Sequence, residues 1–172
     1  MATYNLIQTV TVGAGGAASI AFTSIPQTYT DLQLLVSARS NRATEIRDEI
    51  HVRFNSNTSG YSVRTLRGDG SAVVSNTGSV STALTRMDMP ASGATANIFG
   101  FMNMYIPNYT TANQKAVSMD VTMENSAVTS YLYMIAGLWA NTAAITSITM
   151  TFEIGPLFLQ YSSASLYGIS KT

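Results

Sequence analysis

The sequence predicts an all-β protein, an antiparallel β-sandwich of about eight to ten strands. Apolar and polar side chains alternate along several segments, as in residues 117–124, where Val and Met alternate with polar residues. Turn-forming residues separate these segments, and no stretch shows a sustained helical period. A chain of 172 residues is long enough to bury a core without disulfides, so we expect residues 1–172 to form one β-sandwich domain.

Several segments carry the pattern of a strand. They are residues 4–12, 17–22, 32–38, 50–54, 61–66, 98–106, 117–124, 131–139, 148–154 and 166–169. The alternating ones place apolar side chains on one face only, which is typical of strands with one face in water. Residues 98–106 and 131–139 are apolar on both faces, which predicts central strands or strands covered on both sides.

The segment 71–97 has a weak pattern, because it is rich in Ser, Thr, Ala and Gly and holds few large apolar residues. We expect a long loop or irregular edge strands there. A loop of this length is usually functional or ordered by a partner.

Charge and composition exclude several functions. Only 10% of the residues are charged, and nine basic residues balance nine acidic ones. Nucleic-acid binding and a polybasic membrane patch both need a basic excess, so we expect neither partner. The sequence has no cysteine and a single histidine, His51, which we interpret as structural or merely exposed. We therefore expect no enzyme, no metal site and no cofactor.

The charged residues are concentrated in one short segment. Its members are Arg39, Arg42, Glu45, Arg47, Asp48, Glu49 and Arg53. We interpret them as a candidate contact surface for another subunit, because a guanidinium group pairs two carboxylate oxygens at once. A solvated loop with weak local ion pairs is the alternative. A metal site built from Glu45, Asp48 and Glu49 lacks the spacing of a calcium-binding loop.

A second candidate set is aromatic and methionine-rich. It consists of Phe99, Phe101, Met102, Met104, Tyr105, Tyr131, Tyr133 and Trp139. Core packing is the simplest interpretation. Strands that are apolar on both faces exceed what one sandwich core needs, however, so we expect the surplus face to pack against a neighbouring copy. An exposed aromatic platform for stacking sugars is the third alternative.

Sequence segments spread over nearly the whole chain resemble a family of small structural proteins of tailed bacteriophages, of the type common in marine phages and cyanophages. They are residues 22–32 (FTSIPQTYTDL), 36–39 (VSAR), 53–55 (RFN), 61–62 (YS), 66–71 (LRGDGS), 106–109 (IPNY), 137–139 (GLW), 144–148 (AITSI) and 165–169 (SLYGI). The resemblance implies a jelly-roll-like protein on the outer surface of the virion. It carries over no catalytic residues.

With this resemblance, the expected function is that of a capsid decoration (cement) protein that binds and stabilises the assembled head shell. The expected partners are the major capsid protein and further copies of the chain, as a homotrimer, assembled in the host cytoplasm. The candidate contact with the shell is then the segment from Arg39 to Arg53, the N-terminal strand or the segment 71–97. The alternative function is a tail-fibre or tail-tip module that binds a carbohydrate on the host surface.

Overall fold

The computed structural model describes residues 2–78, 82–125 and 130–170, which form twelve strands and no helix. The strands are β1 (Thr3–Thr11), β2 (Ile20–Phe22), β3 (Asp31–Ala38), β4 (Arg47–Phe54), β5 (Tyr61–Gly68), β6 (Val73–Gly78), β7 (Leu84–Pro90), β8 (Gly100–Ile106), β9 (Lys115–Met123), β10 (Tyr131–Trp139), β11 (Ile148–Phe152) and β12 (Ser163–Ser170). They form an eight-stranded sheet in the order β1-β12-β3-β8-β9-β10-β5-β6 and a four-stranded sheet in the order β2-β11-β4-β7.

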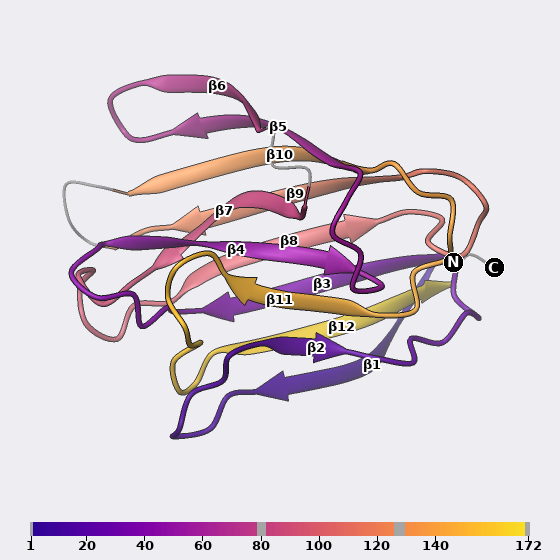
Figure 1. Cartoon of the computed structure of the whole chain (residues 1–172), viewed down its shortest axis with the longest axis horizontal. Coiled ribbons are helices and arrows are strands. Elements are labelled where there is room, and N and C mark those ends of the chain that lie inside the picture. Colours follow the sequence, from indigo (N-terminus) through magenta and orange to yellow (C-terminus); the bar gives the residue numbers. More distant parts are fainter. Residues whose placement is uncertain (1, 79–81, 126–129, 171–172) are drawn as a thin grey trace.

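The two sheets are antiparallel throughout and pack face to face, so that the smaller sheet covers one face of the larger (Figure 1). The predicted antiparallel β-sandwich is therefore confirmed, but the described residues form twelve strands and not the eight to ten that the sequence predicts. The jelly-roll connectivity that the resemblance implies is not confirmed. A jelly roll divides eight strands between two sheets, whereas here one sheet alone contains eight.

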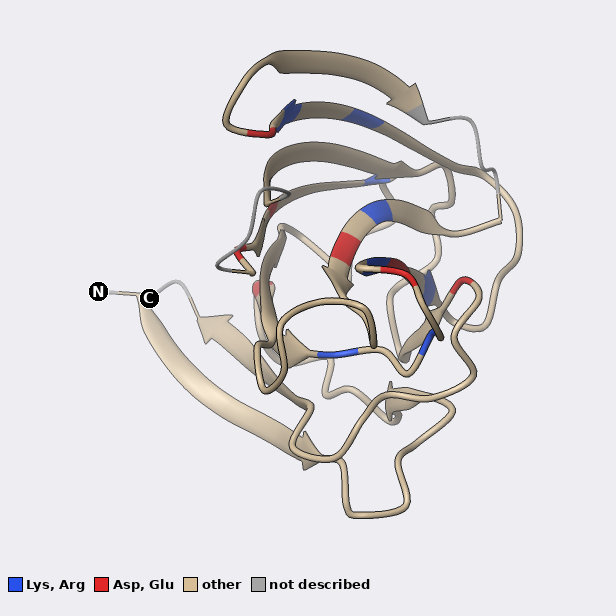
Figure 2. Cartoon of the chain, turned by 90° about the vertical axis from the view of Figure 1, so that its left-hand side faces the viewer, with Lys and Arg blue, Asp and Glu red and all other residues tan. Residues whose placement is uncertain are grey.

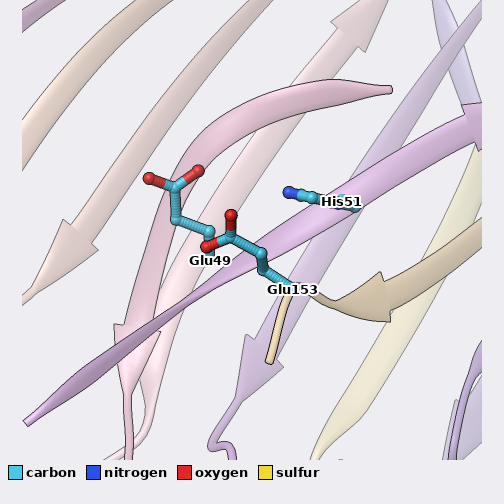
Figure 3. Close-up of side chains that lie close together, drawn as sticks. All are labelled: Glu49, His51 and Glu153. Atoms are coloured by element: carbon cyan, nitrogen blue, oxygen red, sulfur yellow. The ribbon is translucent and has the colours of Figure 1, made fainter. Parts of the chain in front are cut away.

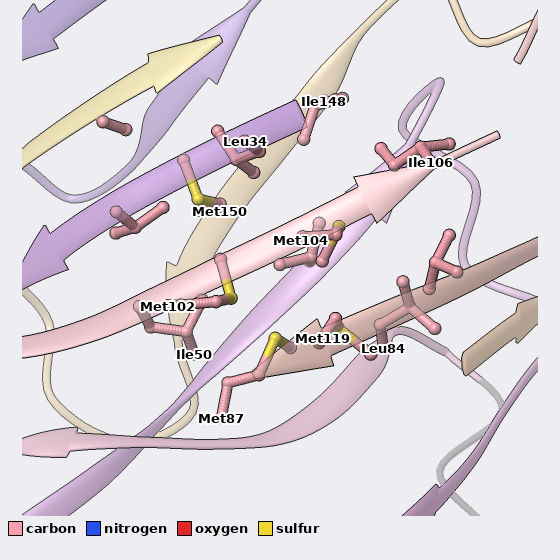
Figure 4. Close-up of a cluster of buried hydrophobic side chains, with 14 of the residues drawn as sticks. Leu34, Ile50, Leu84, Met87, Met102, Met104, Ile106, Met119, Ile148 and Met150 are labelled. Atoms are coloured by element: carbon pink, nitrogen blue, oxygen red, sulfur yellow. The ribbon is translucent and has the colours of Figure 1, made fainter. Parts of the chain in front are cut away.

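Methionine fills much of the space between the sheets. Seven of the nine methionines in the sequence are buried: Met87, Met89, Met102, Met104, Met119, Met123 and Met150. They lie among branched side chains such as Ile50, Leu84 and Ile148 (Figure 4). An unbranched thioether adapts to irregular gaps, so these residues complete the core between two sheets of unequal width.

The strands β8 and β10, whose sequences are apolar on both faces, lie inside the eight-stranded sheet with β9 between them. The prediction of central strands is therefore confirmed. Their inward residues are buried, whereas Phe101, Leu132 and Met134 point outward and are exposed. The outer face of these strands is thus not covered by any other part of the described chain.

The segment 71–97 contains two edge strands and not one long loop. β6 is the edge of the large sheet, and β7 is the edge of the small one. Arg86 in β7 has a φ of 72°, next to a shift in the register between β4 and β7. Because of this irregularity, the buried side chains of Leu84, Met87 and Met89 are unevenly spaced along the strand. The strand is buried, but its sequence does not alternate regularly.

Three aromatic rings connect the two sheets at one place in the core. Trp139 of β10 stacks on Tyr61 of β5 with the ring centroids 6.1 Å apart, and it meets Phe54 of β4 edge-on at 5.6 Å. The backbone N–H of Phe54 donates a hydrogen bond to the Tyr61 hydroxyl at 2.8 Å. This cluster joins β4 of the small sheet to β5 and β10 of the large one.

We expect Trp139→Ala to lower the free energy of unfolding by about 3–5 kcal/mol, because it leaves a cavity between the sheets. Trp139→Phe should cost less, since the indole Nε1 has no hydrogen-bond partner among the described residues and none is lost. Urea unfolding followed by circular dichroism measures both variants. The exposed control Ile154→Ala should shift the free energy by less than about 0.5 kcal/mol. An equally small shift for Trp139→Ala would contradict the role of this cluster.

Candidate functional site

Arg39, the first residue of the charged segment 39–53, is buried and holds a loop in place. Its Nη1 donates to the carbonyl oxygens of Thr95 at 2.7 Å and Ile98 at 2.9 Å, and its Nη2 donates to that of Ala94 at 3.0 Å. The guanidinium therefore satisfies three carbonyl groups between β7 and β8. Most of the Arg39 side chain is therefore used inside its own chain, although it also lines the surface hollow beside Tyr161.

Asp48 is also buried and serves the fold of its own chain. Its carboxylate accepts hydrogen bonds from the Ser40 hydroxyl at 2.7 Å and from the backbone N–H of Gly155 at 2.8 Å. The Nη1 atom of Arg42 lies 3.9 Å from the other carboxylate oxygen. These contacts fasten the segments after β3 and β11 to β4. The Asp48 carboxylate is therefore engaged within its own chain.

Arg47 pairs with a carboxylate on the neighbouring strand β7. Its Nη1 lies 2.5 Å from Oδ2 of Asp88. Tyr133 of β10 donates its hydroxyl hydrogen to the same oxygen, and burial together with the negative charge of Asp88 raises the pKa of Tyr133. One carboxylate thus connects the small sheet to the large sheet through an arginine and a tyrosine.

The remaining charged residues of the segment lie nearer the surface. Glu49 contacts the guanidinium of Arg86 at 3.5 Å, and Arg53 donates from Nε to the carbonyl oxygen of Thr82 at 3.1 Å. Glu45 is exposed. Figure 2 shows charged residues on the upper hairpin and through the middle of the sandwich, while the strand that begins at the N-terminus carries none. Most of the predicted contact surface is therefore used inside the chain.

The structure also brings together a cluster that the sequence analysis does not predict. Glu49 and His51 lie two positions apart on β4 and share one face, and Glu153 directly follows the neighbouring strand β11. One ligand atom from each of the three side chains lies within 4.8 Å of the others (Figure 3). Burial lowers the pKa of His51, and burial together with the charge of Asp88 raises the pKa of Glu49. Only the pairing of β4 with β11 brings Glu153 to this place.

The residues predicted to pack against a second copy divide between the two faces of the large sheet. Met102, Met104, Tyr133 and Trp139 occupy inward positions of β8 and β10 and are buried in the core of their own chain. A second copy has no access to them. For these four residues, core packing is the correct interpretation.

Two tyrosines of the same set are engaged at the surface. The Tyr105 hydroxyl donates to Asp31 at 2.6 Å, and this hydrogen bond raises the pKa of Tyr105 to about 12. The ring of Tyr131 lies beneath two guanidinium groups, with Cζ of Arg47 and Arg67 at 5.3 and 5.0 Å from its centroid. Because these cations already occupy the ring, Tyr131 is a poor platform for a sugar.

The outer face of the eight-stranded sheet is broad and carries few charges, with Arg64 and Asp120 exposed on it. One row of cross-strand partners contains Ser163, Ser37, Phe101, Thr122, Leu132, Gly68 and Val73, and the next contains Ser165, Leu35, Asn103, Asp120, Met134, Leu66 and Ser75. Asp120 is the one charged residue in the two rows. Leu132 and Met134 are 56% and 61% exposed, and a shallow hollow of about 380 Å³ lies beside Met134. The face therefore presents hydroxyl groups around an apolar patch.

Strand β1 forms an open edge of the same sheet. Its sequence, TYNLIQTVT, carries no charge and no proline, and most of its residues are exposed. Edge strands usually carry lysine, proline or bulges that prevent other strands from adding to them. The register shifts once, between Leu6 and Gln8, and no charged residue protects the strand. Outside the irregularity between Leu6 and Gln8, its outer N–H and C=O groups are open to pairing with another strand.

A surface hollow of about 310 Å³ contains two aromatic residues. Tyr161 is 71% exposed and has a φ of 73°, a backbone conformation that favours glycine. Phe99 is half-buried, and the side chains of Asn97 and Gln160 line the same hollow. A bulky residue held in a strained conformation with its ring in solvent adds little to packing, and such strain is typical of functional sites.

No family model, no curated protein and no solved structure matches this chain. Among the residues that the structure describes, no helix is long and apolar enough to cross a membrane. The functional interpretation therefore depends on the surfaces described above: the outer face of the large sheet, the edge strand β1, the hollow at Tyr161 and the cluster around His51.

We expect Asp88→Ala to lower the free energy of unfolding by roughly 2–4 kcal/mol, because Arg47 and Tyr133 lose their shared acceptor in a buried position. Tyr133→Phe removes one of the two hydrogen bonds and should cost roughly 1–2 kcal/mol. Denaturant unfolding compares them with the exposed control Glu45→Ala, which should stay close to the wild type. If Asp88→Ala is as stable as this control, the carboxylate does not hold the two sheets together.

Proposed function

We propose that this protein is a structural, non-catalytic component of a tailed-phage particle, which associates with copies of itself and coats the head shell. The observation that carries the proposal is the uncovered outer face of the eight-stranded sheet. It places Leu132, Met134 and Phe101 in water with one charged residue in the two rows around them. Contact with neighbouring subunits would remove this apolar area from water and so stabilise an assembly.

The composition of this face suits repeated, weak contacts. Serine and threonine hydroxyls both donate and accept hydrogen bonds, so they can pair with many partner groups. A zero net charge favours association over mutual repulsion. On a lattice of identical sites, many weak contacts per particle give strong binding through avidity. The likeness of the sequence segments to small virion proteins supports a homotrimer on the head, with the major capsid protein as its partner.

We expect the purified chain to form oligomers, and the double variant Leu132→Lys/Met134→Lys to be monomeric, because two cations on the apolar patch oppose its burial. Both side chains are exposed in the single chain, so the variant should still fold. Sedimentation velocity measures the oligomeric state. The matched control Ile154→Lys, at a residue 58% exposed and outside the large sheet, should leave the oligomer intact.

The same variants test the location on the particle. The purified chain is sedimented with isolated phage heads and, separately, with isolated tails. Heads should retain the wild type and Ile154→Lys, and they should retain less of the double variant. A wild-type chain that is monomeric and is not retained by heads would contradict the decoration role, and retention by tails alone would favour the second candidate.

The second candidate is a tail-fibre or tail-tip module that binds a host-surface carbohydrate. It is favoured by the hollow at Tyr161, where an exposed ring, the Phe99 ring and the amides of Asn97 and Gln160 lie together. Aromatic rings stack on the apolar faces of sugars. A side-chain amide carries both a hydrogen-bond donor and an acceptor, so it can pair with sugar hydroxyls in both directions. The strained backbone conformation of Tyr161 is explained if it positions the ring to contact a ligand.

For this candidate function, we expect Tyr161→Gly to have opposite effects on the stability of the fold and on carbohydrate binding. Glycine accepts the positive φ without strain, so the free energy of unfolding should rise by roughly 0.5–1 kcal/mol, while loss of the ring should abolish carbohydrate binding. Tyr161→Phe keeps the ring and should keep binding. Binding is measured on a glycan array and stability by urea unfolding. An array on which the wild type binds nothing, or on which Tyr161→Gly binds equally well, would exclude this role for the hollow.

A further inference from the structure

We propose that Glu49, His51 and Glu153 form a binding site for a divalent transition metal, with zinc as the best-fitting ion. One imidazole nitrogen and two carboxylate oxygens are ligands that zinc accepts in sites with three protein ligands. The site lies on the outer face of the four-stranded sheet, on the side of the sandwich opposite the outer face of the eight-stranded sheet. It is independent of the proposed structural role.

Strand register places the three side chains on one surface. His51 is the cross-strand partner of Thr151, and the backbone N–H of Glu153 donates to the carbonyl oxygen of Glu49 at 2.9 Å. Glu153 is therefore the direct neighbour of Glu49 and the diagonal neighbour of His51, on the face opposite the buried Ile50. Figure 3 shows the nitrogen-bearing end of the His51 ring facing the two carboxylates. The rigid sheet brings the ligands together before any ion binds.

The Nε2 atom of His51 is the second observation that points to a ligand. This nitrogen is inaccessible to solvent and has no hydrogen-bond partner among the described residues, although an oxygen from each of two carboxylates lies within 4.8 Å of an imidazole nitrogen of the same ring. A buried polar atom without a partner costs free energy, so native structures usually satisfy it. A neutral imidazole nitrogen and carboxylate oxygens are all electron-pair donors. A cation placed between them would satisfy the three groups at once.

The surroundings prepare the ligands. Glu49 accepts hydrogen bonds from the backbone N–H of Arg86 at 3.2 Å and from its guanidinium at 3.5 Å. Such donors orient a ligating carboxylate and leave its other lone pairs for the ion. Zinc–ligand bonds of about 2.0–2.2 Å place the ligand atoms about 3–3.5 Å apart. The ligand atoms of this cluster lie within 4.8 Å of one another, so side chains near this limit must move closer together to bind zinc. Glu153 is exposed, so its side chain has room to rotate inward.

Calorimetric titration of the untagged, chelator-treated full chain with zinc chloride tests the proposal. We expect one zinc ion per chain and a higher thermal unfolding midpoint with zinc, because the ion binds the folded state. Glu153→Gln and His51→Gln should each weaken binding by more than about tenfold. The matched control Glu45→Gln removes an exposed carboxylate of the same charged segment and should bind like the wild type.

NMR spectroscopy gives a direct readout at His51. It is the only histidine in the sequence, so its imidazole resonances do not overlap with those of another histidine. Zinc should shift these resonances in the wild type and in Glu45→Gln. Absence of saturable binding, or binding that Glu153→Gln and His51→Gln both leave unchanged, would overturn the site. Glu153→Gln alters an exposed side chain, so a loss of binding in a variant with the wild-type circular dichroism spectrum cannot come from unfolding.

Discussion

The burial of one face of a wide sheet by a narrow one is the constraint on which the rest of this structure depends. Four strands cover the inner face of a sheet of eight, and the core between them is filled by methionine and branched aliphatic side chains. Apolar burial stabilises this arrangement in proportion to the area removed from water. Because a strand has two faces, the same arrangement leaves a second broad face without a covering layer. The fold thus creates both the core and the surface that an assembly can use.

The scarcity of charge has a related explanation. Several of the charged side chains work inside the chain: Arg39 holds the carbonyl groups of a loop, Asp48 fastens two connecting segments, and Asp88 joins the two sheets. A desolvated charge is stabilised by its ion pairs and hydrogen bonds, which makes such contacts specific to one arrangement of loops and strands. Ionic groups therefore specify the connections, and the outer face of the large sheet carries few charges, among them Asp120 and Arg64.

The proposed surfaces do not compete for space. Association through the outer face of the large sheet would leave the outer face of the small sheet open, and the cluster of Glu49, His51 and Glu153 lies there. An ion on that face would bridge β4 and β11, two paired strands of the narrow sheet. It would stabilise the layer that covers the core, while the proposed contacts with other subunits would use the wide sheet.

Local sequence patterns determine the class of this protein. Alternation with a period of two depends only on neighbouring residues, so the strands outside 71–97 and the antiparallel sandwich are predictable from the sequence alone. β7 escapes prediction because the irregularity at Arg86 interrupts its alternation. Periodicity also cannot decide which face of β8 or β10 is the inner one when both are apolar. That choice is made by the four-stranded sheet, which covers Met104 and Trp139 and leaves Phe101 and Met134 in water.

The partners of the charged residues were decided only by tertiary structure. Arg39 is buried because a distant loop offers three carbonyl groups, and Glu153 reaches His51 because β4 and β11 pair in one particular register. A sequence shows which residues carry charge and how they are spaced. Which groups those residues meet depends on pairing between strands far apart in the chain, and no local pattern records it.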